Sequence, residues 1–301
     1  MSFPRQVLPG QVLFITRRCT QRQFLLRPDD EVNQALEYCL AEAAARFDVT
    51  VLWFMGMSNH MHYGIFDPHG VYPAFMAHFH RNVAKVLNCK WGRWENLWSN
   101  EQASVVQCVR PEDAFDKMVY SLTNPFEHHL VERAHHWPGV TSLTPQLIDK
   151  TRRVRRPRWY FDKEGAMPEW VELRYGRPPG FDHLSHEAWA DKLRAAIAAE
   201  ETKAAEERKR TRIPILGVRT IKAQSPFETP ATSEDRFGIN PRVAAKSKWA
   251  RIAALQRNKR FQARYRAAFA ARRRGELDVQ FPFGTYHLRI TGLVRVEPPP
   301  A

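Results

Sequence analysis

The sequence predicts an α+β fold: a ferredoxin-like, split β-α-β antiparallel sheet with an added helix, followed by a mainly helical, basic C-terminal region. The order of apolar patterns is the first observation, because strand and helix periods alternate as strand, helix, strand, strand, helix, strand. A further helical pattern follows the fourth strand. The third observation is the charge of the C-terminal part, where residues 241–275 contain twelve Lys and Arg and no Asp or Glu.

The individual elements of the first part follow from local patterns. Strands are expected at residues 12–17, 50–55, 60–66 and 103–110, where β-branched and aromatic residues cluster. Helices are expected at residues 31–47, 73–88 and 113–124. The first of these is preceded by Pro-Asp-Asp at residues 28–30, a typical capping sequence.

The remainder of the chain is divided by composition. Residues 1–145 form the first unit, residues 146–185 an Arg-, Pro- and Trp-rich connector, and residues 186–301 the basic C-terminal region. Within that region we expect a solvated helix at 186–212, a linker at about 213–240, a basic helix or helix pair at 243–274 and a short strand at 285–290.

The net charge of +14 and the pI near 9.9 favour a polyanionic partner, above all nucleic acid. No apolar run is long enough for a transmembrane helix, and no signal-peptide stretch opens the chain, so we expect a cytoplasmic, nucleoid-associated protein without a membrane partner. It would act as a monomer or homodimer. Nucleic-acid contacts are expected from Arg152, Arg153, Arg155, Arg156, Lys248, Arg251, Arg257, Lys259, Arg260 and Arg264. Candidate base-stacking aromatics are Trp159, Tyr160, Trp249, Phe261 and Tyr265.

His60 and His62 are the first half of a candidate catalytic centre. Alternate side chains of a strand share a face, so both imidazoles can reach one cation while Met61 points into the core. The alternative is a pair of half-exposed histidines without a role. His78 and His80 have the same spacing but lie in a helical pattern, where residues two apart diverge, and are assigned to solvent or packing.

Tyr120 and Asn124 are the second half, since helical i, i+4 spacing places them on one face. A phenol is a weak nucleophile at neutral pH and needs a divalent cation, Mg²⁺ or Mn²⁺, to polarise a phosphate. Two imidazoles and the Asn124 amide would supply three ligands. Two alternatives stay open: Tyr120 as a core aromatic, and Asn124 as the N-cap of a helix starting at Pro125, with the preceding helix ending at Asn124.

Residues 57–62 (Met-Ser-Asn-His-Met-His) resemble the M-P-N-H-hydrophobic-H signature of HUH single-tyrosine transposases. The segment from Tyr120 to Val131 resembles the Y-x-x-x-N-P segment of the REP-associated tyrosine transposase branch. Further matches, all within residues 8–145, lie at 16–19, 92–93, 97–98 and 132–138. The resemblance implies metal binding by His60, His62 and Asn124, and cleavage of single-stranded or hairpin DNA by Tyr120 through a 5′-phosphotyrosine. Arg17 and Arg18 join the expected nucleic-acid contacts.

Three departures from the family pattern concern the surface around the centre. Ser58 replaces the usual proline, residues 99–102 (Ser-Asn-Glu-Gln) stand where a Gln-Gly-Arg-Phe-like stretch is common, and residues 126–128 (Phe-Glu-His) replace Val-Arg-Ala. The last two remove positive charge. The sequence therefore predicts a transposase-like DNA nuclease and strand transferase. The alternative is a non-catalytic nucleic-acid-binding or repressor protein on the same scaffold.

Overall fold

The computed structural model describes residues 4–232 and 241–299, and its centre is a five-stranded sheet in the order β2-β3-β1-β4-β7. The strands are β1 (Gln11–Arg18), β2 (Thr50–Gly56), β3 (His60–Asp67), β4 (Ser104–Cys108) and β7 (Val243–Ala244). All pairings among β1, β2, β3 and β4 are antiparallel, while β7 runs parallel to β4. The antiparallel pairing of the four predicted strands is confirmed, but the complete sheet is mixed, because a fifth strand from the C-terminal region joins its edge.

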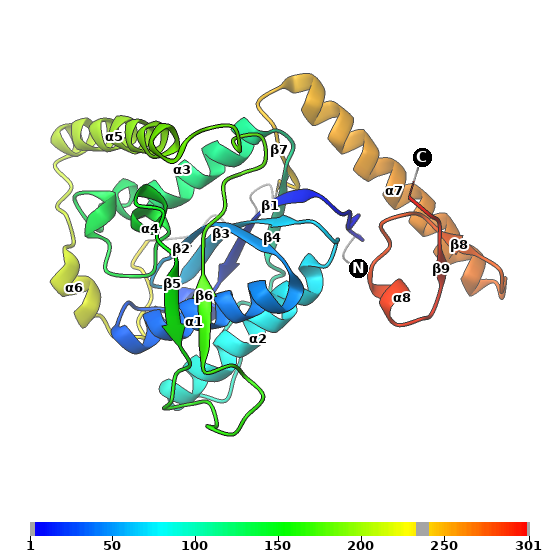
Figure 1. Cartoon of the computed structure of the whole chain (residues 1–301), viewed down its shortest axis with the longest axis horizontal. Coiled ribbons are helices and arrows are strands. Elements are labelled where there is room, and N and C mark those ends of the chain that lie inside the picture. The colour runs from blue at the N-terminus through cyan, green and yellow to red at the C-terminus, as the bar shows by residue number, and fades with distance from the viewer. Residues whose placement is uncertain (1–3, 233–240, 300–301) are drawn as a thin grey trace.

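Helices cover both faces of the sheet (Figure 1). α1 (Asp30–Phe47) and α2 (Tyr72–Lys90) pack together on one face, and α3 (Pro111–Glu127) covers the other, with α5 (His186–Thr211) packed on α3. Successive side chains of β3 point to opposite faces of the sheet and so contribute to both layers. Met61, Tyr63 and Ile65 are buried in the core under α1 and α2, so the intervening side chains face α3. The expected element order of the first 127 residues is confirmed.

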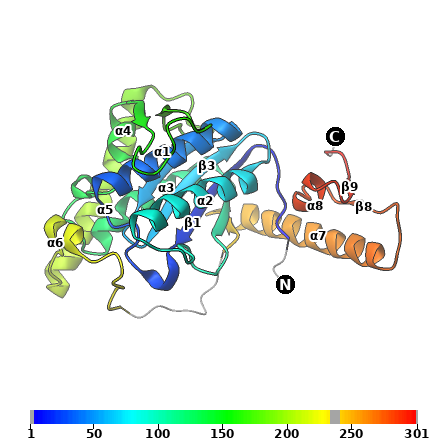
Figure 2. The ribbon, with the colours of Figure 1, turned by 90° about the horizontal axis from the view of Figure 1, so that it is seen from below.

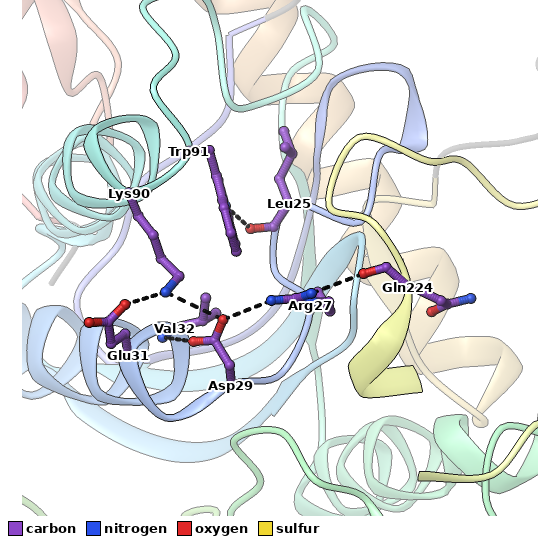
Figure 3. Close-up of polar contacts among 8 residues, drawn as sticks. All are labelled: Leu25, Arg27, Asp29, Glu31, Val32, Lys90, Trp91 and Gln224. Carbon is purple, nitrogen blue, oxygen red and sulfur yellow. Dashed lines mark hydrogen bonds and ion pairs between the residues drawn. The ribbon is translucent and has the colours of Figure 1, made fainter. Parts of the chain in front are cut away.

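The start of α1 is fixed by a polar cluster, which Figure 3 shows. Asp29 is the N-cap: its Oδ1 accepts the Val32 N–H at 2.8 Å. Its Oδ2 forms ion pairs with Arg27 at 3.2 Å and with Lys90 of α2 at 3.4 Å. The cap predicted at residues 28–30 is confirmed, and the same carboxylate also ties the two helices of this layer together.

The expected connector and linker both contain ordered elements. β5 (Arg152–Arg155) and β6 (Trp170–Leu173) form a hairpin against α1, and α4 (Leu143–Leu147) precedes it. α6 (Val218–Ala223) lies in the predicted linker and buries Ile221. α5 is not simply solvated, because its N-terminal half buries Trp189, Leu193 and Ile197. Residues 233–240 of the linker lie outside the described part. Short 3-10 turns occur at η1 (Thr20–Arg22) and η2 (Ala134–His136).

The basic region is one helix, α7 (Lys248–Arg273), which leads away from the sheet in both views (Figures 1 and 2). β8 (Gln280–Phe281) and β9 (Arg295–Val296) form a small parallel pair near its far half. The strand expected at 285–290 is wrong. That segment turns into α8 (His287–Ile290), because the Thr285 N–H and hydroxyl both bind the Pro282 carbonyl and close a turn. No described helix is both long and apolar enough to cross a bilayer.

Replacing Asp29 with Ala tests the polar cluster at α1. The substitution removes the N-cap acceptor and two ion-pair contacts, so we expect the free energy of unfolding to fall by about 1–2 kcal/mol. Urea denaturation measures this. Asp30→Ala removes an exposed carboxylate of the same first turn and serves as the control, with an expected loss of less than about 0.5 kcal/mol. Equal losses in the two variants would contradict the capping role of Asp29.

Candidate active site

His60 and His62 converge at the start of β3, on the face of the sheet that α3 covers. Their Nε2 atoms lie 3.0 Å apart. The other ring nitrogen of each histidine forms a hydrogen bond with a neighbouring side chain. Nδ1 of His60 contacts Asn59 Oδ1 at 2.7 Å, and Nδ1 of His62 contacts Thr16 Oγ1 at 2.9 Å. Met61 is buried in the opposite core, as predicted. The arrangement points two imidazole nitrogens at one position, and outer hydrogen bonds of this kind orient metal-binding histidines in proteins.

The pair fits a small divalent cation. Two octahedral ligands about 2.1 Å from an ion and at right angles lie about 3.0 Å apart, the separation of the two Nε2 atoms. Burial is the main cause that lowers the pKa of His60 to about 4, helped by the nearby charges of His128, Arg18 and Arg22. Burial, with His60, His128 and Lys117, also holds the pKa of His62 well below its usual value. Both rings are therefore neutral near pH 7, as metal ligands must be.

Tyr120 projects from α3 toward the histidines. Its ring meets the His62 ring edge-on with centroids 5.8 Å apart, and it meets the Phe14 ring in the same way at 6.2 Å. The side chain is 43% exposed, so it is not a core aromatic and that alternative is wrong. Lys117, one turn earlier, lies 5.5 Å from the ring centroid. Partial burial, with Glu127 as a smaller cause, raises the pKa of the phenol, which makes unassisted attack harder.

Asn124 lies one turn after Tyr120 and is buried. Its Oδ1 has no hydrogen-bond partner among the described residues, an unusual state for a buried amide oxygen. The capping alternative and the helix end predicted at Asn124 are both wrong, because α3 runs through Pro125 to Glu127. Proline removes one backbone hydrogen bond, but Asn124, Pro125 and Phe126 are all buried and their packing holds the turn helical. The amide oxygen is thus left for another partner.

These side chains line one cleft of about 530 Å³. Its walls come from both halves of the chain, since Leu216, Ile221, Gln224, Pro230 and Thr232 join His60, His62, Tyr120, Asn124 and His128. Among the described lining residues there is no Asp or Glu, whereas Arg18 and Arg22 are present. The cleft therefore favours an anion. Within the described part, no group of three His, Cys, Asp or Glu is placed to hold a metal ion.

The wall formed by residues 216–232 is tied down at several points. The N–H groups of Leu216 and Gly217 donate to the carbonyls of His129 and Leu130 at 2.9 and 3.0 Å, directly after α3. At the other end, Phe24 N–H donates to Glu228 O at 3.0 Å, and the Arg27 guanidinium donates to Gln224 O at 3.1 Å (Figure 3). The segment predicted as linker thus forms part of the site.

The predicted nucleic-acid contacts lie in different places. Arg18 lines the cleft, but Arg17 points to the other face of the sheet, where it donates to Glu101 O and stacks on Trp98. In the β5–β6 hairpin, Arg152 pairs with Glu37 and Arg155 with Glu169, while Arg153 stacks on Trp170. Arg156 is buried and binds the carbonyls of Lys163, Gly165 and Met167, so it is committed to the loop. The remaining six are Lys248, Arg251, Arg257, Lys259, Arg260 and Arg264, all on α7.

The other histidines and aromatic candidates are divided between packing and surface. His80 is buried and contacts the Tyr63 hydroxyl, while His78 contacts Glu42, so the assignment to local packing is confirmed. Phe261 is buried, and Trp159, Tyr160 and Tyr265 are half-buried. Trp249, at the start of α7, is 76% exposed.

Sequence reasoning missed several residues of the site. Thr16 and Asn59 carried a usable signal: Thr16 is the register partner of His62 across β1 and β3, and Asn59 precedes His60. Lys117 lies one turn before Tyr120 on the same helix face. Ile221 and Gln224 carried no such signal, because their place in the cleft depends on contacts with residues about ninety to two hundred positions away.

No protein-family model and no curated protein matches this chain. The structure is similar to two solved transposase structures. One is a REP-associated tyrosine transposase bound to a REP hairpin: 16% identity, 56% of this chain and 97% of that chain covered, TM-score 0.42. The other is a candidate transposase from Deinococcus radiodurans R1: 19% identity, 35% and 85% covered, TM-score 0.28. With such low identities and TM-scores, function has to be inferred from this chain's own site residues.

The lowered histidine pKa values predict a loss of stability in acid. The unfolded His60 ring takes up a proton near pH 6.5, but the folded one does so only near pH 4. Between these values the unfolded state binds more protons, so the free energy of unfolding falls as the pH falls. Without metal, the free energy of unfolding of His60→Asn should therefore change less steeply with pH than that of the wild type. The difference in slope should be up to about 1.4 kcal/mol per pH unit. Urea denaturation at several values from pH 7 to pH 4 measures this slope. His136→Asn, at a surface histidine, is the control and should keep the wild-type slope. The same slope in His60→Asn as in the wild type would refute the lowered pKa of His60.

Proposed function

We propose that this protein is a transposase-like, metal-dependent single-stranded DNA endonuclease and strand transferase that acts at hairpin or repeat DNA. The observation that carries the proposal is that Tyr120 meets His62 of the imidazole pair in a cleft whose described lining residues include no Asp or Glu. The unpartnered oxygen of Asn124 completes the donor set. We also infer a ferredoxin-like core, supported by the strand order β2-β3-β1-β4 with α1 and α2 on one face.

His60, His62 and Asn124 would hold the cation, Mg²⁺ or Mn²⁺, through two neutral nitrogens and one amide oxygen. When bound, the cation would polarise the scissile phosphate and stabilise negative charge on the departing oxygen. The donor set supports this role because both Nε2 atoms point to one position and the Asn124 oxygen has no other described partner. Asn59 and Thr16 keep the outer nitrogens engaged, so the rings cannot turn away.

The Tyr120 oxygen acts as the nucleophile. It bonds to the phosphorus as the bond from phosphorus to the 3′ oxygen breaks, which leaves a 5′-phosphotyrosine and a 3′-hydroxyl. The phenol loses its proton and the 3′ oxygen gains one. Because one ester replaces another, a 3′-hydroxyl can attack the phosphotyrosine in the reverse direction and rejoin strands without an external energy source. The Lys117 ammonium lies 5.5 Å from the centroid of the Tyr120 ring.

The surroundings of the cleft supply the attraction for the strand. Arg18 and Arg22 line it, and His128 lies one turn beyond Asn124 on the same side of α3. The long basic helix α7 adds phosphate contacts away from the cleft, and phosphate contacts dominate affinity for DNA. Affinity and chemistry therefore reside in different parts of the molecule.

Replacing Tyr120 with Phe tests the nucleophile. The wild-type protein, incubated with Mn²⁺ and labelled single strands that carry a hairpin, should form a covalent adduct that survives a denaturing gel. Tyr120→Phe keeps the ring contacts with His62 and Phe14 but has no oxygen to attack, so no adduct should form. Tyr286→Phe, at the N-cap of α8 and remote from the cleft, is the matched control and should react normally. An adduct with Tyr120→Phe would exclude this nucleophile, and no wild-type adduct on any hairpin strand would favour the non-catalytic alternative.

Replacing His60 with Ala separates chemistry from binding. Loss of one of two converging nitrogens should abolish cleavage, while hairpin affinity should change by less than about tenfold because phosphate contacts elsewhere provide most of it. Cleavage gels and fluorescence anisotropy measure the two effects on the same oligonucleotide. His78→Ala, a histidine of the opposite layer, is the control. An equal loss of binding and cleavage would argue against the separation.

A further inference from the structure

Helix α7 carries five of its cations in a row along one side: Lys248, Arg251, Lys259, Arg266 and Arg273. Their steps of three, eight, seven and seven residues keep all five within an arc of about 80° at 100° per residue. We call this row the cationic stripe. All five side chains are exposed, and the buried residues of the helix, Ala254, Phe261 and Ala268, lie on a different side. The stripe is therefore presented to solvent along the full length of the helix.

Several cations of the helix have partners within the protein; in the stripe itself, Arg266 Nε donates to Gln262 O at 3.3 Å. Arg257 donates to Gln107 of β4 at 2.9 Å, and Arg264 pairs with Glu297. Phe261 and Tyr265 pack against each other, and Tyr265 also packs against Phe281 of β8, which fixes this flank. With no Asp or Glu in residues 241–275, no carboxylate of the helix itself neutralises the stripe. The stripe is thus a surface for an anionic partner.

The shape and length of α7 indicate what kind of polyanion fits. Both views show the helix leading away from the sheet as a straight rod (Figures 1 and 2). From Lys248 to Arg273 the stripe spans about 38 Å, the length of about eleven base pairs of duplex. Proteins hold unpaired strands in grooves that follow the flexible backbone. The groove that α7 does line, with Ala253, Arg257 and Phe261, lies on the opposite side of the helix, so the stripe itself is a convex surface. A stiff duplex already presents its phosphates in an extended array and needs no ordering on such a rod.

The first residues before α7 attach it to the helix that carries Tyr120. Lys246 N–H donates to Asp113 Oδ1 at 2.7 Å, and its ammonium pairs with Asp116 at 2.6 Å, both on α3. Ser247 then caps α7 by accepting the Ala250 N–H at 3.3 Å. Asp116 is one helical turn before Tyr120. A duplex on the stripe would therefore be held at a fixed offset from the nucleophile.

We infer that the cationic stripe of α7 binds the phosphates of double-stranded DNA, namely the paired stem that adjoins the strand in the cleft. The identity of that strand rests on the function proposed above, but binding of duplex by α7 does not need the chemistry to occur. The stripe sets the distance between the foot of the stem and the cleaved phosphate. The protein thus distinguishes a hairpin from an unpaired strand by a surface remote from the cleft.

The test compares two oligonucleotides of equal length, one with a twelve-base-pair stem and one unpaired, in salt titrations with full-length protein. The double variant Arg251→Ala, Lys259→Ala should reduce the slope of log affinity against log salt by about two for the hairpin. Its hairpin affinity should fall about tenfold or more, with less than about a twofold change for the unpaired strand. Alanine is the best helix former, so α7 should stay folded, which circular dichroism checks.

Lys85→Ala with Lys209→Ala removes the same charge from the surfaces of α2 and α5 and serves as the matched control. The inference would be overturned if this control variant lost as much hairpin affinity as the α7 variant. It would also be overturned if the α7 variant lost equal affinity for the hairpin and for the unpaired strand. Adduct formation on a short unpaired strand is measured in parallel. If the α7 variant loses affinity only for the hairpin and the wild type forms no adduct, duplex binding by the stripe is supported and the nuclease function is overturned. If the wild type forms an adduct but the α7 variant shows no hairpin-selective loss of affinity, the nuclease function is supported and duplex binding by the stripe is overturned.

Discussion

The position of the Trp53 indole over Gly64 is the packing constraint on which the site depends. A Cβ on residue 64 would lie 2.2 Å from the Trp53 ring, so any residue other than glycine at this position would displace the indole. An irregularity of β2 between Val51 and Trp53 brings the indole opposite Gly64. The buried Nε1–H then donates to Ser121 Oγ at 3.0 Å and fixes α3 against the sheet. Since Tyr120 and Asn124 flank Ser121 on that helix, this contact sets how both face the histidine pair.

The described residues that line the cleft carry positive charge and no carboxylate. Buried imidazoles and an amide can hold a divalent ion, but neutral ligands attract it weakly, and Arg18 and Arg22 repel it. Phosphate oxygens of a bound strand would supply the missing charge. In the proposed mechanism, cation and strand therefore strengthen each other's binding. The raised pKa of the phenol keeps Tyr120 protonated near pH 7, so in the proposed mechanism attack would depend on polarisation of the phosphate.

Local periodicity was sufficient to predict much of the fold and of the histidine centre. The alternation of β3 gave the convergence of His60 and His62, and the helical spacing gave the shared face of Tyr120 and Asn124. Pro125 misled, because its local preference against helix was outweighed by burial of the turn around it. Arg156 also misled, because composition cannot tell a guanidinium that binds carbonyls from one that faces solvent. β7 and α6 depend on pairing with distant segments, for which the sequence holds no local signal.

In the proposed mechanism, the wall formed by residues 216–232 would affect the lifetime of the covalent intermediate. A phosphotyrosine ester is open to hydrolysis, and water reaching it would leave a cleaved DNA strand that the enzyme could no longer rejoin. Leu216, Ile221 and Pro230 place apolar surface beside the reacting groups. A shortened protein ending near residue 145 would retain every chemical group yet expose the linkage to bulk solvent. The C-terminal half would then protect the covalent intermediate from hydrolysis as well as bind nucleic acid.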